Sequence, residues 1–418
     1  MKKHLIISIC SAALKVIGTV ALVVILARVF SLADFGNFTY SLTLGTLLSL
    51  LVDFGYNLKV IRDVSLEGAN IKKVATSAFF SKIALFIFAL IILVIGQNIL
   101  DIDNKVKMAS LLIFLSFSFY SLTNTFLSVF KGLRKYLLEL KLVAFDNIMT
   151  FVGVSIVAFL TNDIVWASLS FMISRILSFI YSLWIYLQEY GMISPKVKMI
   201  KEDILEALPY AAHYWVGNAY LNIDTIIMET MVSVEKIGIY QSGIRIVMGL
   251  GVLLTAINAV YLPLFNEANS RGREVLIGTV KKINGRIILF AVLVAIVMIL
   301  FDETIILILY GNKFLELNTF FWVFAVIVFL RIIGASYGIL LTISNKQTLR
   351  AIAGFLSIII ITVLDYYLIP IKGYVAAAYV LLAAHVFMTV FYVVSVYLEH
   401  GSFFVPNIGG LNQTKPKK

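Results

Sequence analysis

The chain has 418 residues, of which 61% are hydrophobic and only 14% are charged, and its formal net charge is +11. A soluble domain has about 25% charged residues, and one water-soluble core could not cover this much apolar surface. The composition excludes a cytosolic enzyme, a secreted disulfide scaffold and a long disordered chain. In a membrane protein, a basic net charge first indicates cytoplasmic loops, so we expect no nucleic-acid partner.

Apolar segments predict membrane-spanning helices, because about 20 apolar residues cross a bilayer. The first segment follows Lys2 and Lys3 as in a signal peptide. It runs from Leu5 to about Phe30 and contains Lys15, so we expect an uncleaved span. The twelve expected spans lie at about 5–30, 36–58, 74–96, 107–130, 141–160, 163–187, 204–230, 238–263, 281–309, 317–341, 349–369 and 373–398. The short connections between them leave no room for an extramembrane domain.

The basic residues follow the alternation of these spans. Of the 34 Lys and Arg residues, 23 lie at the termini and in alternate connections, whereas 6 lie in the connections on the other side. Lys and Arg collect on the cytoplasmic side of short loops. This asymmetry predicts that both termini are cytoplasmic.

An internal repeat divides the chain into halves. Residues 29–41 align without gaps to residues 231–243, and each copy lies between the first and second span of its half. Because six spans is an even number, the halves have the same orientation. We therefore predict an all-α integral membrane protein with twelve transmembrane helices in two six-helix lobes around a central cavity. The lobes comprise residues 1–200 and 201–400, and residues 401–418 form a cytoplasmic basic tail.

Five cations lie well inside the expected spans, away from the ends that were counted with the connections. A basic side chain at mid-membrane costs about 2.5–3.5 kcal/mol on insertion scales, so it has to pair, reach the interface or line water. Most of these cations share a helix face with small or polar residues, which indicates either close helix packing or a cavity wall. We prefer the cavity, and for Lys82 we leave interfacial snorkelling open as an equal alternative. The candidate cavity cations are Lys15, Lys82, Arg175, Arg245 and Arg331.

The seventh expected span is the most polar and carries His213 and Asp224, with Pro209 near its start. Asp224 is either a counter-ion to Arg245 or a protonatable coupling site. A hydrogen-bonded packing role is the more common outcome for a mid-span histidine such as His213. Pro209 predicts a kink.

Three other acids lie at membrane depth. Asp365 stands beside Tyr366 and Tyr367, which indicates an aromatic-belt position, although it remains a third coupling candidate after Asp224 and His213. Asp53 and Asp146 lie near the cytoplasmic ends of their spans. For these two we expect helix caps or interfacial ion pairs.

The sequence contains no catalytic constellation, no Gly-rich phosphate loop and no metal-ligand cluster. It therefore predicts a transporter and not an enzyme, with no metal or cofactor beyond a coupling H⁺ or Na⁺. A cavity lined by Lys and Arg attracts anions, and guanidinium groups bind phosphate with two parallel hydrogen bonds. A lipid-linked pyrophosphate sugar fits such a cavity, because its tail can stay in the bilayer.

Several short segments resemble those of the Wzx-type polysaccharide repeat-unit flippases, in the multidrug/oligosaccharidyl-lipid/polysaccharide (MOP) exporter superfamily. The resemblance covers nearly the whole chain, and each motif is loose, so the order and spacing carry the specificity. The segments are Leu26–Phe38, Asp53–Asn57 followed by Arg62 and Asp63, Phe130–Lys135, Asn222–Asp224, Ile237–Tyr240 and Leu262–Phe265.

The resemblance implies translocation of an undecaprenyl-pyrophosphate-linked O-antigen or capsule repeat unit across the bacterial inner membrane. It also implies alternating access of the lobes, coupled to H⁺ or Na⁺ flow. Lys15, Arg175, Arg245 and Arg331 would be the lumen cations and Asp224 the coupling acid. The implied partners are the lipid-linked oligosaccharide, the phospholipid bilayer and the polysaccharide polymerase and assembly proteins.

Three other functions compete with this hypothesis. A multidrug/organic-cation antiporter of the same superfamily commonly has an acid in its first span, where this chain has Lys15. A lipid II flippase usually has two additional C-terminal spans. A membrane-embedded glycosyltransferase or polymerase would need a large periplasmic loop, and the connections here are too short.

Overall fold

In the computed structural model, the chain is described over residues 2–99, 102–191 and 197–400, and no strand occurs within these ranges. The expected basic tail, 401–418, lies outside the described residues. The helices are α1 (Lys2–Val29), α2 (Leu32–Asp53), α3 (Tyr56–Val64), α4 (Ile71–Ile99), α5 (Asn104–Gly132), α6 (Tyr136–Thr161), α7 (Ile164–Tyr190), α8 (Val197–Ala219), α9 (Ile223–Glu229), α10 (Val234–Gly249), α11 (Gly251–Ser270), α12 (Arg273–Leu300), α13 (Asp302–Leu309), the 3₁₀ helix η1 (Asn312–Phe320), α14 (Phe321–Ile343), α15 (Gln347–Lys372) and α16 (Val375–His400).

Ten helical segments in the described part of the chain are long and apolar enough to cross a membrane. They coincide with ten of the twelve expected spans. The first and seventh expected spans coincide with α1 and with α8 followed by α9. The all-α, multi-pass membrane fold is thus confirmed, while ten segments rather than twelve meet the criteria of length and hydropathy.

Several expected spans are interrupted or shifted. The second span ends at Asp53, because Phe54 and Gly55 both have positive φ angles, 48° and 72°. Only a glycine fits at position 55, since a Cβ there would lie 2.4 Å from the backbone of Tyr210 in α8. Helix α8 continues through Pro209, where the sequence predicted a kink, and ends at Ala219. Neighbouring helices allow proline inside membrane helices.

The eighth and ninth expected spans also differ from the prediction. The eighth is divided at Leu250 into α10 and α11. The ninth begins at Arg273 and ends at Leu300, and residues 302–309 form the separate helix α13. Hydropathy does not mark this break because the sequence stays apolar on both sides of it. Asp302 and Glu303 instead begin the new helix, where acidic side chains stabilise the N-terminal dipole.

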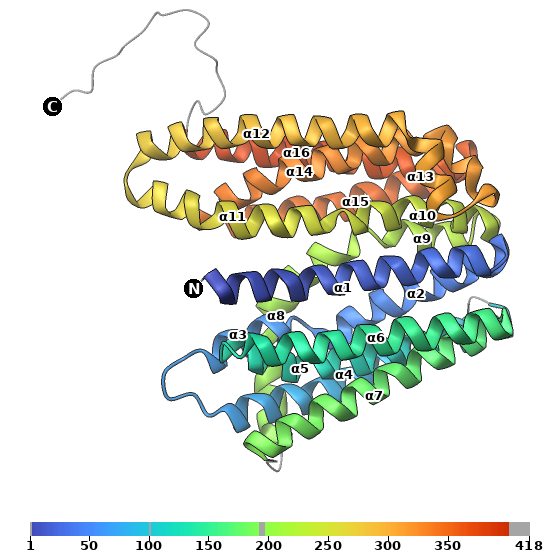
Figure 1. Ribbon diagram of the computed structural model, residues 1–418, viewed down its shortest axis with the longest axis horizontal. Coiled ribbons are helices and arrows are strands. Elements are labelled where there is room, and N and C mark those ends of the chain that lie inside the picture. Colours follow the sequence, from blue (N-terminus) through green and yellow to red (C-terminus); the bar gives the residue numbers. More distant parts are fainter. Residues whose placement is uncertain (1, 100–101, 192–196, 401–418) are drawn as a thin grey trace, which may run out of the picture.

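The helices form two groups (Figure 1). One group contains α1 to α7 and the other α9 to α16, with their long axes running in a common direction. Helix α8 lies at the border, because it packs against α2, α3 and α4 of the first group and against α15 of the second. We call these groups the N-terminal and the C-terminal lobe.

The two copies of the repeated sequence pack directly against each other, where α2 crosses α10. A Cβ at Gly36 would lie 2.0 Å from the carbonyl oxygen of Val234, and one at Gly238 would lie 3.1 Å from that of Leu32. Ser31 caps α2 by accepting a hydrogen bond from the backbone N–H of Asp34. The repeated glycines therefore allow the two helices to approach at backbone distance.

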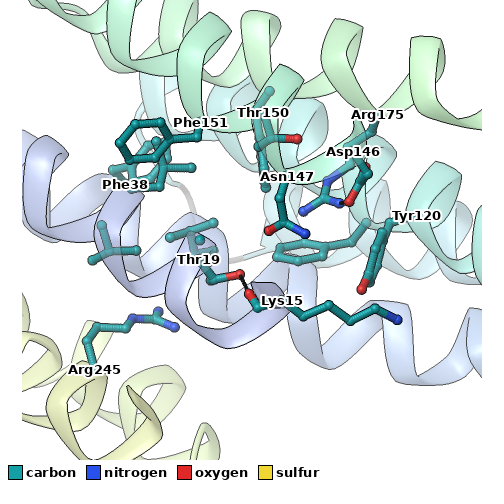
Figure 2. A pocket seen from close by; sticks show the side chains of 16 residues that line it. Lys15, Thr19, Phe38, Tyr120, Asp146, Asn147, Thr150, Phe151, Arg175 and Arg245 are labelled. Atoms are coloured by element: carbon teal, nitrogen blue, oxygen red, sulfur yellow. Dashed lines mark hydrogen bonds and ion pairs between the residues drawn. The ribbon is translucent and has the colours of Figure 1, made fainter. Parts of the chain in front are cut away.

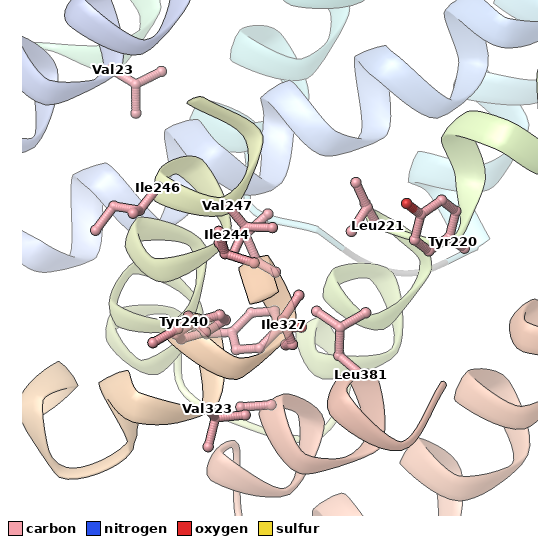
Figure 3. Packing of buried hydrophobic residues seen from close by; sticks show 14 of the residues in the cluster. Val23, Tyr220, Leu221, Tyr240, Ile244, Ile246, Val247, Val323, Ile327 and Leu381 are labelled. Carbon is pink, nitrogen blue, oxygen red and sulfur yellow. The ribbon is translucent and has the colours of Figure 1, made fainter. Parts of the chain in front are cut away.

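A continuous apolar core connects the lobes and is densest in the C-terminal one. Ile244 and Val247 of α10 belong to the same buried cluster as Val323 and Ile327 of α14, and Leu381 of α16 lies beside them (Figure 3). The cluster extends into α1 and α2 of the N-terminal lobe. Helix α10 is therefore fixed by the C-terminal core on one side while it contacts α1 and α2 on the other.

At the end of the bundle where α1 meets α2, one basic side chain from each lobe donates hydrogen bonds to the other lobe. Arg28, in the last turn of α1, donates hydrogen bonds to the backbone carbonyls of residues 307–309 at the end of α13. Lys313 in turn donates to the carbonyls of Arg28 and Phe30 at the end of α1. The last carbonyls of a helix lack intrahelical partners and carry partial negative charge. Each lobe thus caps a helix end of the other, and we call Arg28 and Lys313 the reciprocal cap.

Two further contacts close the same end of the bundle. Phe35 and Phe314 meet edge to face with ring centroids 5.2 Å apart. Glu316 pairs with the ammonium of Lys236 at 2.5 Å and accepts a hydrogen bond from the Tyr374 hydroxyl at 2.7 Å. The aromatic contact joins the two lobes, whereas the Glu316 contacts lie within the C-terminal lobe.

Loss of the reciprocal cap should open this end. We expect Arg28→Ala combined with Lys313→Ala to lengthen the distance between spin labels at positions 161 and 372, which lie at this end of α6 and α15. Pulsed electron paramagnetic resonance on the purified protein, in a Cys10→Ser background, measures this distance. The control is Arg28→Lys, which keeps the charge near the carbonyls. An unchanged distance distribution in the double variant would show that the apolar contacts alone close the lobes.

Candidate functional site

A cavity lined by basic and polar side chains lies in the N-terminal lobe, against α10 of the C-terminal lobe. It has a volume of about 110 Å³ and is lined by residues of α1, α2, α5, α6 and α7, with Arg245 from α10. Three of the five candidate cations line it, namely Lys15, Arg175 and Arg245. In Figure 2 the three side chains come from different helices, and that of Lys15 extends away from Arg245.

Arg175 is the most firmly positioned of the three cations. Its guanidinium group donates to the carboxylate of Asp146 on α6. The same group lies over the ring of Tyr120, 4.2 Å from the centroid, and 5.2 Å from that of Phe171. An ion pair and two cation–π contacts fix a rigid, planar donor at the cavity wall.

Arg245 and Lys15 keep free donors. Arg245 is only 8% exposed, and within the described residues its Nε and Nη2 atoms have no hydrogen-bond partner. Its Nη1 atom contacts only the sulfur of Met248, at 3.6 Å. For Lys15 the structure gives no carboxylate partner among the described side chains, and its backbone carbonyl accepts from Thr19. These two cations are available to a ligand.

The charge of the cavity is unbalanced. Three cations face one carboxylate, that of Asp146. A buried charge that lacks a partner is costly, by several kcal/mol even after relaxation. Water and an anion in the cavity would remove that cost, whereas an organic cation would increase it. The arrangement is therefore suited to bind an anion, with a guanidinium on each side of it.

Lys82 does not line this cavity. It is fully buried, with its ammonium group 3.4 Å from the Asp53 carboxylate and hydrogen bonds to the Asn57 side chain and the Ser121 carbonyl. Neither snorkelling nor cavity lining describes this residue. Its partners come from the break between α2 and α3 and from α5. Asp53 forms an ion pair, one of the two roles expected for it, with Lys82 as the partner.

Arg331 lines a separate cavity in the C-terminal lobe, together with His385 and Arg350. It shares no lining residue with the cavity of Lys15, Arg175 and Arg245. His385 is buried and hydrogen-bonded, since its Nδ1 atom lies 2.9 Å from the Leu381 carbonyl. The five candidate cations thus divide among three places.

The acidic coupling candidates form their own group. Asp224 does not pair with Arg245; its carboxylate accepts from the Tyr240 hydroxyl and from Thr225. Asp365 is fully buried and close enough to Asp224 for electrostatic interaction. The aromatic-belt interpretation of Asp365 is therefore wrong, because the exposed Tyr366 and Tyr367 point away from it toward the outside of the bundle. The side chain of His213 lies outside the described residues.

Sequence reasoning missed three cavity residues, Tyr120, Asn147 and Arg350, and it assigned Asp146 to an interfacial role. Asp146 and Arg175 are 29 residues apart on different helices, so no local spacing could reveal their pairing. A search for acidic residues expected at the same membrane depth as each cation would have suggested the pair of Asp146 and Arg175. Within the described ranges, no three His, Cys, Asp or Glu side chains form a group that could hold a metal.

A protein-family comparison matches residues 1–269 to the family described as polysaccharide biosynthesis protein. The chain belongs to the polysaccharide biosynthesis protein family. A search of curated proteins returned no match. The resemblance to the flippases of the MOP superfamily is therefore confirmed at the level of the family and, by the following structures, of the fold.

Solved structures share the fold over nearly the whole chain. The lipid II flippase MurJ in an inward closed conformation aligns with a TM-score of 0.74 at 14% identity, covering 95% of this chain and 90% of that one. A MATE-family multidrug transporter of the MOP superfamily in an inward-facing conformation aligns with a TM-score of 0.72 at 11% identity, covering 93% and 95%. An outward-facing MATE transporter aligns at 0.65 with 14% identity, covering 95% and 96%.

The buried Lys82 pair should support the fold rather than the cavity. Lys82→Ala leaves the Asp53 carboxylate buried without its ion-pair partner, and removal of one partner of a buried pair costs about 3–5 kcal/mol. We expect a clear loss of thermal stability in detergent. Lys82→Met with Asp53→Leu should recover it, because apolar residues can replace a buried pair. Lys282→Ala, an exposed site on α12, is the control. Equal melting of Lys82→Ala and the control would contradict this role.

Proposed function

We propose that this protein is a flippase that moves an undecaprenyl-pyrophosphate-linked oligosaccharide, an O-antigen or capsule repeat unit, across the bacterial inner membrane. The observation that carries the proposal is the cavity in which Lys15, Arg175 and Arg245 face a single carboxylate. A pyrophosphate is the part of such a lipid that cannot cross hydrocarbon unaided. Cations at mid-depth offset the loss of its hydration.

The family and the fold support the proposal. The family is described by polysaccharide biosynthesis, and the lipid II flippase MurJ carries a lipid-linked substrate by its own name. In this proposal both termini are cytoplasmic, as the distribution of Lys and Arg indicates. The reciprocal cap then lies at the periplasmic side, and translocation requires it to break and re-form. The protein acts as a transporter, with no chemical step of its own.

The second candidate is an organic-cation antiporter, which the MATE-like fold favours. The excess of positive charge in the cavity argues against it, since a cationic drug would enter beside unpaired guanidinium and ammonium groups. Resistance to cationic drugs distinguishes the two functions. A flippase leaves the minimum inhibitory concentration of such drugs unchanged on deletion, and an antiporter lowers it.

Arg245→Ala should strongly reduce translocation without unfolding the protein, because it removes a cation that has no ion-pair partner. Each lost charge-assisted hydrogen bond costs about 1.5–3 kcal/mol, so we expect the rate to fall by about tenfold or more. The measurement is surface polysaccharide in cells with matched protein levels. Arg245→Lys should retain part of the activity, and Lys282→Ala all of it.

Arg175 needs a matched variant, because its removal alone leaves the buried Asp146 unpaired. Arg175→Gln with Asp146→Asn preserves shape and hydrogen bonding while it removes both charges. We expect this double variant to fold and to lose surface polysaccharide. Wild-type polysaccharide in both this variant and Arg245→Ala would refute the cationic cavity as the substrate site.

We also propose that Asp224 and Asp365 couple transport to an H⁺ or Na⁺ gradient. Both oxygens of Asp365 lack a hydrogen-bond partner among the described residues, although the side chain is fully buried. A second carboxylate, that of Asp224, lies near it. Two buried carboxylates are stable together only when a proton or a cation reduces their charge. If these carboxylates bind H⁺ or Na⁺ in one arrangement of the lobes and release it in the other, ion flow is coupled to transport.

Asp365→Asn should abolish the dependence of transport on the ion gradient. Asparagine keeps the size of the side chain. Its neutral amide does not take up a proton near neutral pH and has no negative charge to hold Na⁺. Proteoliposomes with an imposed H⁺ or Na⁺ gradient and a fluorescent lipid-linked sugar measure the effect. Glu274→Gln, an exposed site on α12, is the control. Unchanged gradient dependence in Asp365→Asn and Asp224→Asn would place coupling elsewhere.

A further inference from the structure

The C-terminal lobe contains a second polar cavity, distinct from that of Lys15, Arg175 and Arg245. It consists of two adjoining spaces of about 160 and 170 Å³. They share four lining residues, namely Tyr220, Arg350, Met388 and Tyr392. The walls come from α8, α11, α14, α15 and α16, and none of the residues lining the first cavity contributes to them.

The charge of this second cavity is positive. Arg331 of α14 and Arg350 of α15 both line it, and none of its lining residues is an Asp or Glu. Nor does either arginine form an ion pair among the salt bridges of the described residues. Two guanidinium groups without a carboxylate in a membrane-embedded space repel each other, so this arrangement requires an anion or ample water.

Several nitrogen atoms at the cavity remain without partners. In the described part of the chain, Arg331 Nη1, Arg350 Nε and His385 Nε2 are buried and make no hydrogen bond. Arg350 is nonetheless held in place, because its Nη1 atom donates to the Thr342 hydroxyl at 2.8 Å. A positioned guanidinium with a free N–H next to a second guanidinium is the donor set that an oxyanion needs.

The small residues of α14 have a role in this arrangement. Gly334 and Ala335 line the cavity beside Arg331. A Cβ at Gly338 would lie 3.4 Å from Arg350 Nε, in ordinary van der Waals contact. The small face of α14 thus packs against the guanidinium of Arg350.

We infer that Arg331 and Arg350 form a second anion site, which binds a phosphate or carboxylate group of the transported molecule. The inference rests on the proposed function for the origin of the anion, but the site itself rests on the two guanidinium groups. A lipid-linked oligosaccharide offers two sources of such a group, its pyrophosphate and the carboxylate of an acidic sugar. One substrate can therefore be held at both lobes, or its pyrophosphate can pass from one lobe to the other.

The test is anion binding to the purified full-length protein in lipid nanodiscs, by equilibrium dialysis. The probes are radiolabelled inorganic pyrophosphate, inorganic phosphate and glucuronate. We expect the wild type to bind oxyanions at two sites. Arg331→Ala with Arg350→Ala should remove one site, and Lys15→Ala with Arg245→Ala the other. Lys281→Ala with Lys282→Ala, which removes two exposed charges on α12, should bind as the wild type does.

The probes distinguish the sources of the anion. A second site that takes pyrophosphate supports transfer of the lipid headgroup between lobes, and one that takes only glucuronate supports recognition of an acidic sugar. Wild-type stoichiometry in Arg331→Ala/Arg350→Ala would overturn the inference, as would a single site that depends on Lys15 and Arg245. Neither of these results contradicts the proposed flippase function. That proposal fails if no variant reduces surface polysaccharide.

Folding is checked separately, by the melting temperature without anion and by gel filtration. Should Arg331→Ala/Arg350→Ala fail to fold, Arg331→Lys with Arg350→Lys replaces it. Lysine retains the charge and lacks the planar pair of donors. We expect at least tenfold weaker binding at the second site in that variant. Undiminished affinity there would show that the guanidinium geometry plays no part and would overturn the inference.

Discussion

A charged side chain inside a bilayer has no solvent to stabilise it, and this constraint organises the protein. Arg175 and Lys82 meet it with carboxylates, Asp146 and Asp53, from other helices. Arg245, Arg331 and, despite its ion pair, Arg175 retain buried nitrogen atoms without partners in the described structure. Because leaving such groups unpaired is costly, their persistence indicates places that a ligand or an ion occupies during transport. The Lys82–Asp53 pair stabilises helix packing, whereas Arg175, Arg245 and Arg331 line cavities and still have nitrogen atoms free for a ligand.

Closure at one end of the bundle depends on the same physics. Arg28 and Lys313 bind carbonyls that no helix can satisfy by itself. Water can take over these hydrogen bonds when the lobes separate, because the freed carbonyls are then hydrated. Buried apolar contacts at the same end, such as that of Phe35 with Phe314, add to the free energy of closure. The close crossing of Gly36 and Gly238 supplies the complementary requirement. It brings two helix backbones together tightly enough to exclude a hydrophilic substrate.

The sequence predicted the elements that hydropathy and charge determine, and it failed where distant side chains meet. Periodic apolar runs located the spans, and the matching copies at 29–41 and 231–243 lie where α2 packs against α10. Two buried contacts were not predictable, because in each the partners lie on different helices. These are the contact of Lys82 with Asp53 and that of Asp365 with Asp224. The break after Leu300 was missed for a different reason: α13 is as apolar as α12, and only its first two acids mark the new helix.

Arg245 shows how binding and lobe movement can depend on each other. It belongs to α10, which the C-terminal core fixes, yet its guanidinium lines a cavity formed otherwise by N-terminal helices. Any shift of α10 relative to α1 and α7 changes the spacing among Arg245, Lys15 and Arg175. An anion bound to all three therefore favours the arrangement in which they are close, and it is released when they separate. A ligand shifts a conformational equilibrium only by its differential affinity for the two states. A cation supplied across the lobe interface provides that difference, whereas three cations from one lobe would bind the anion equally in both states.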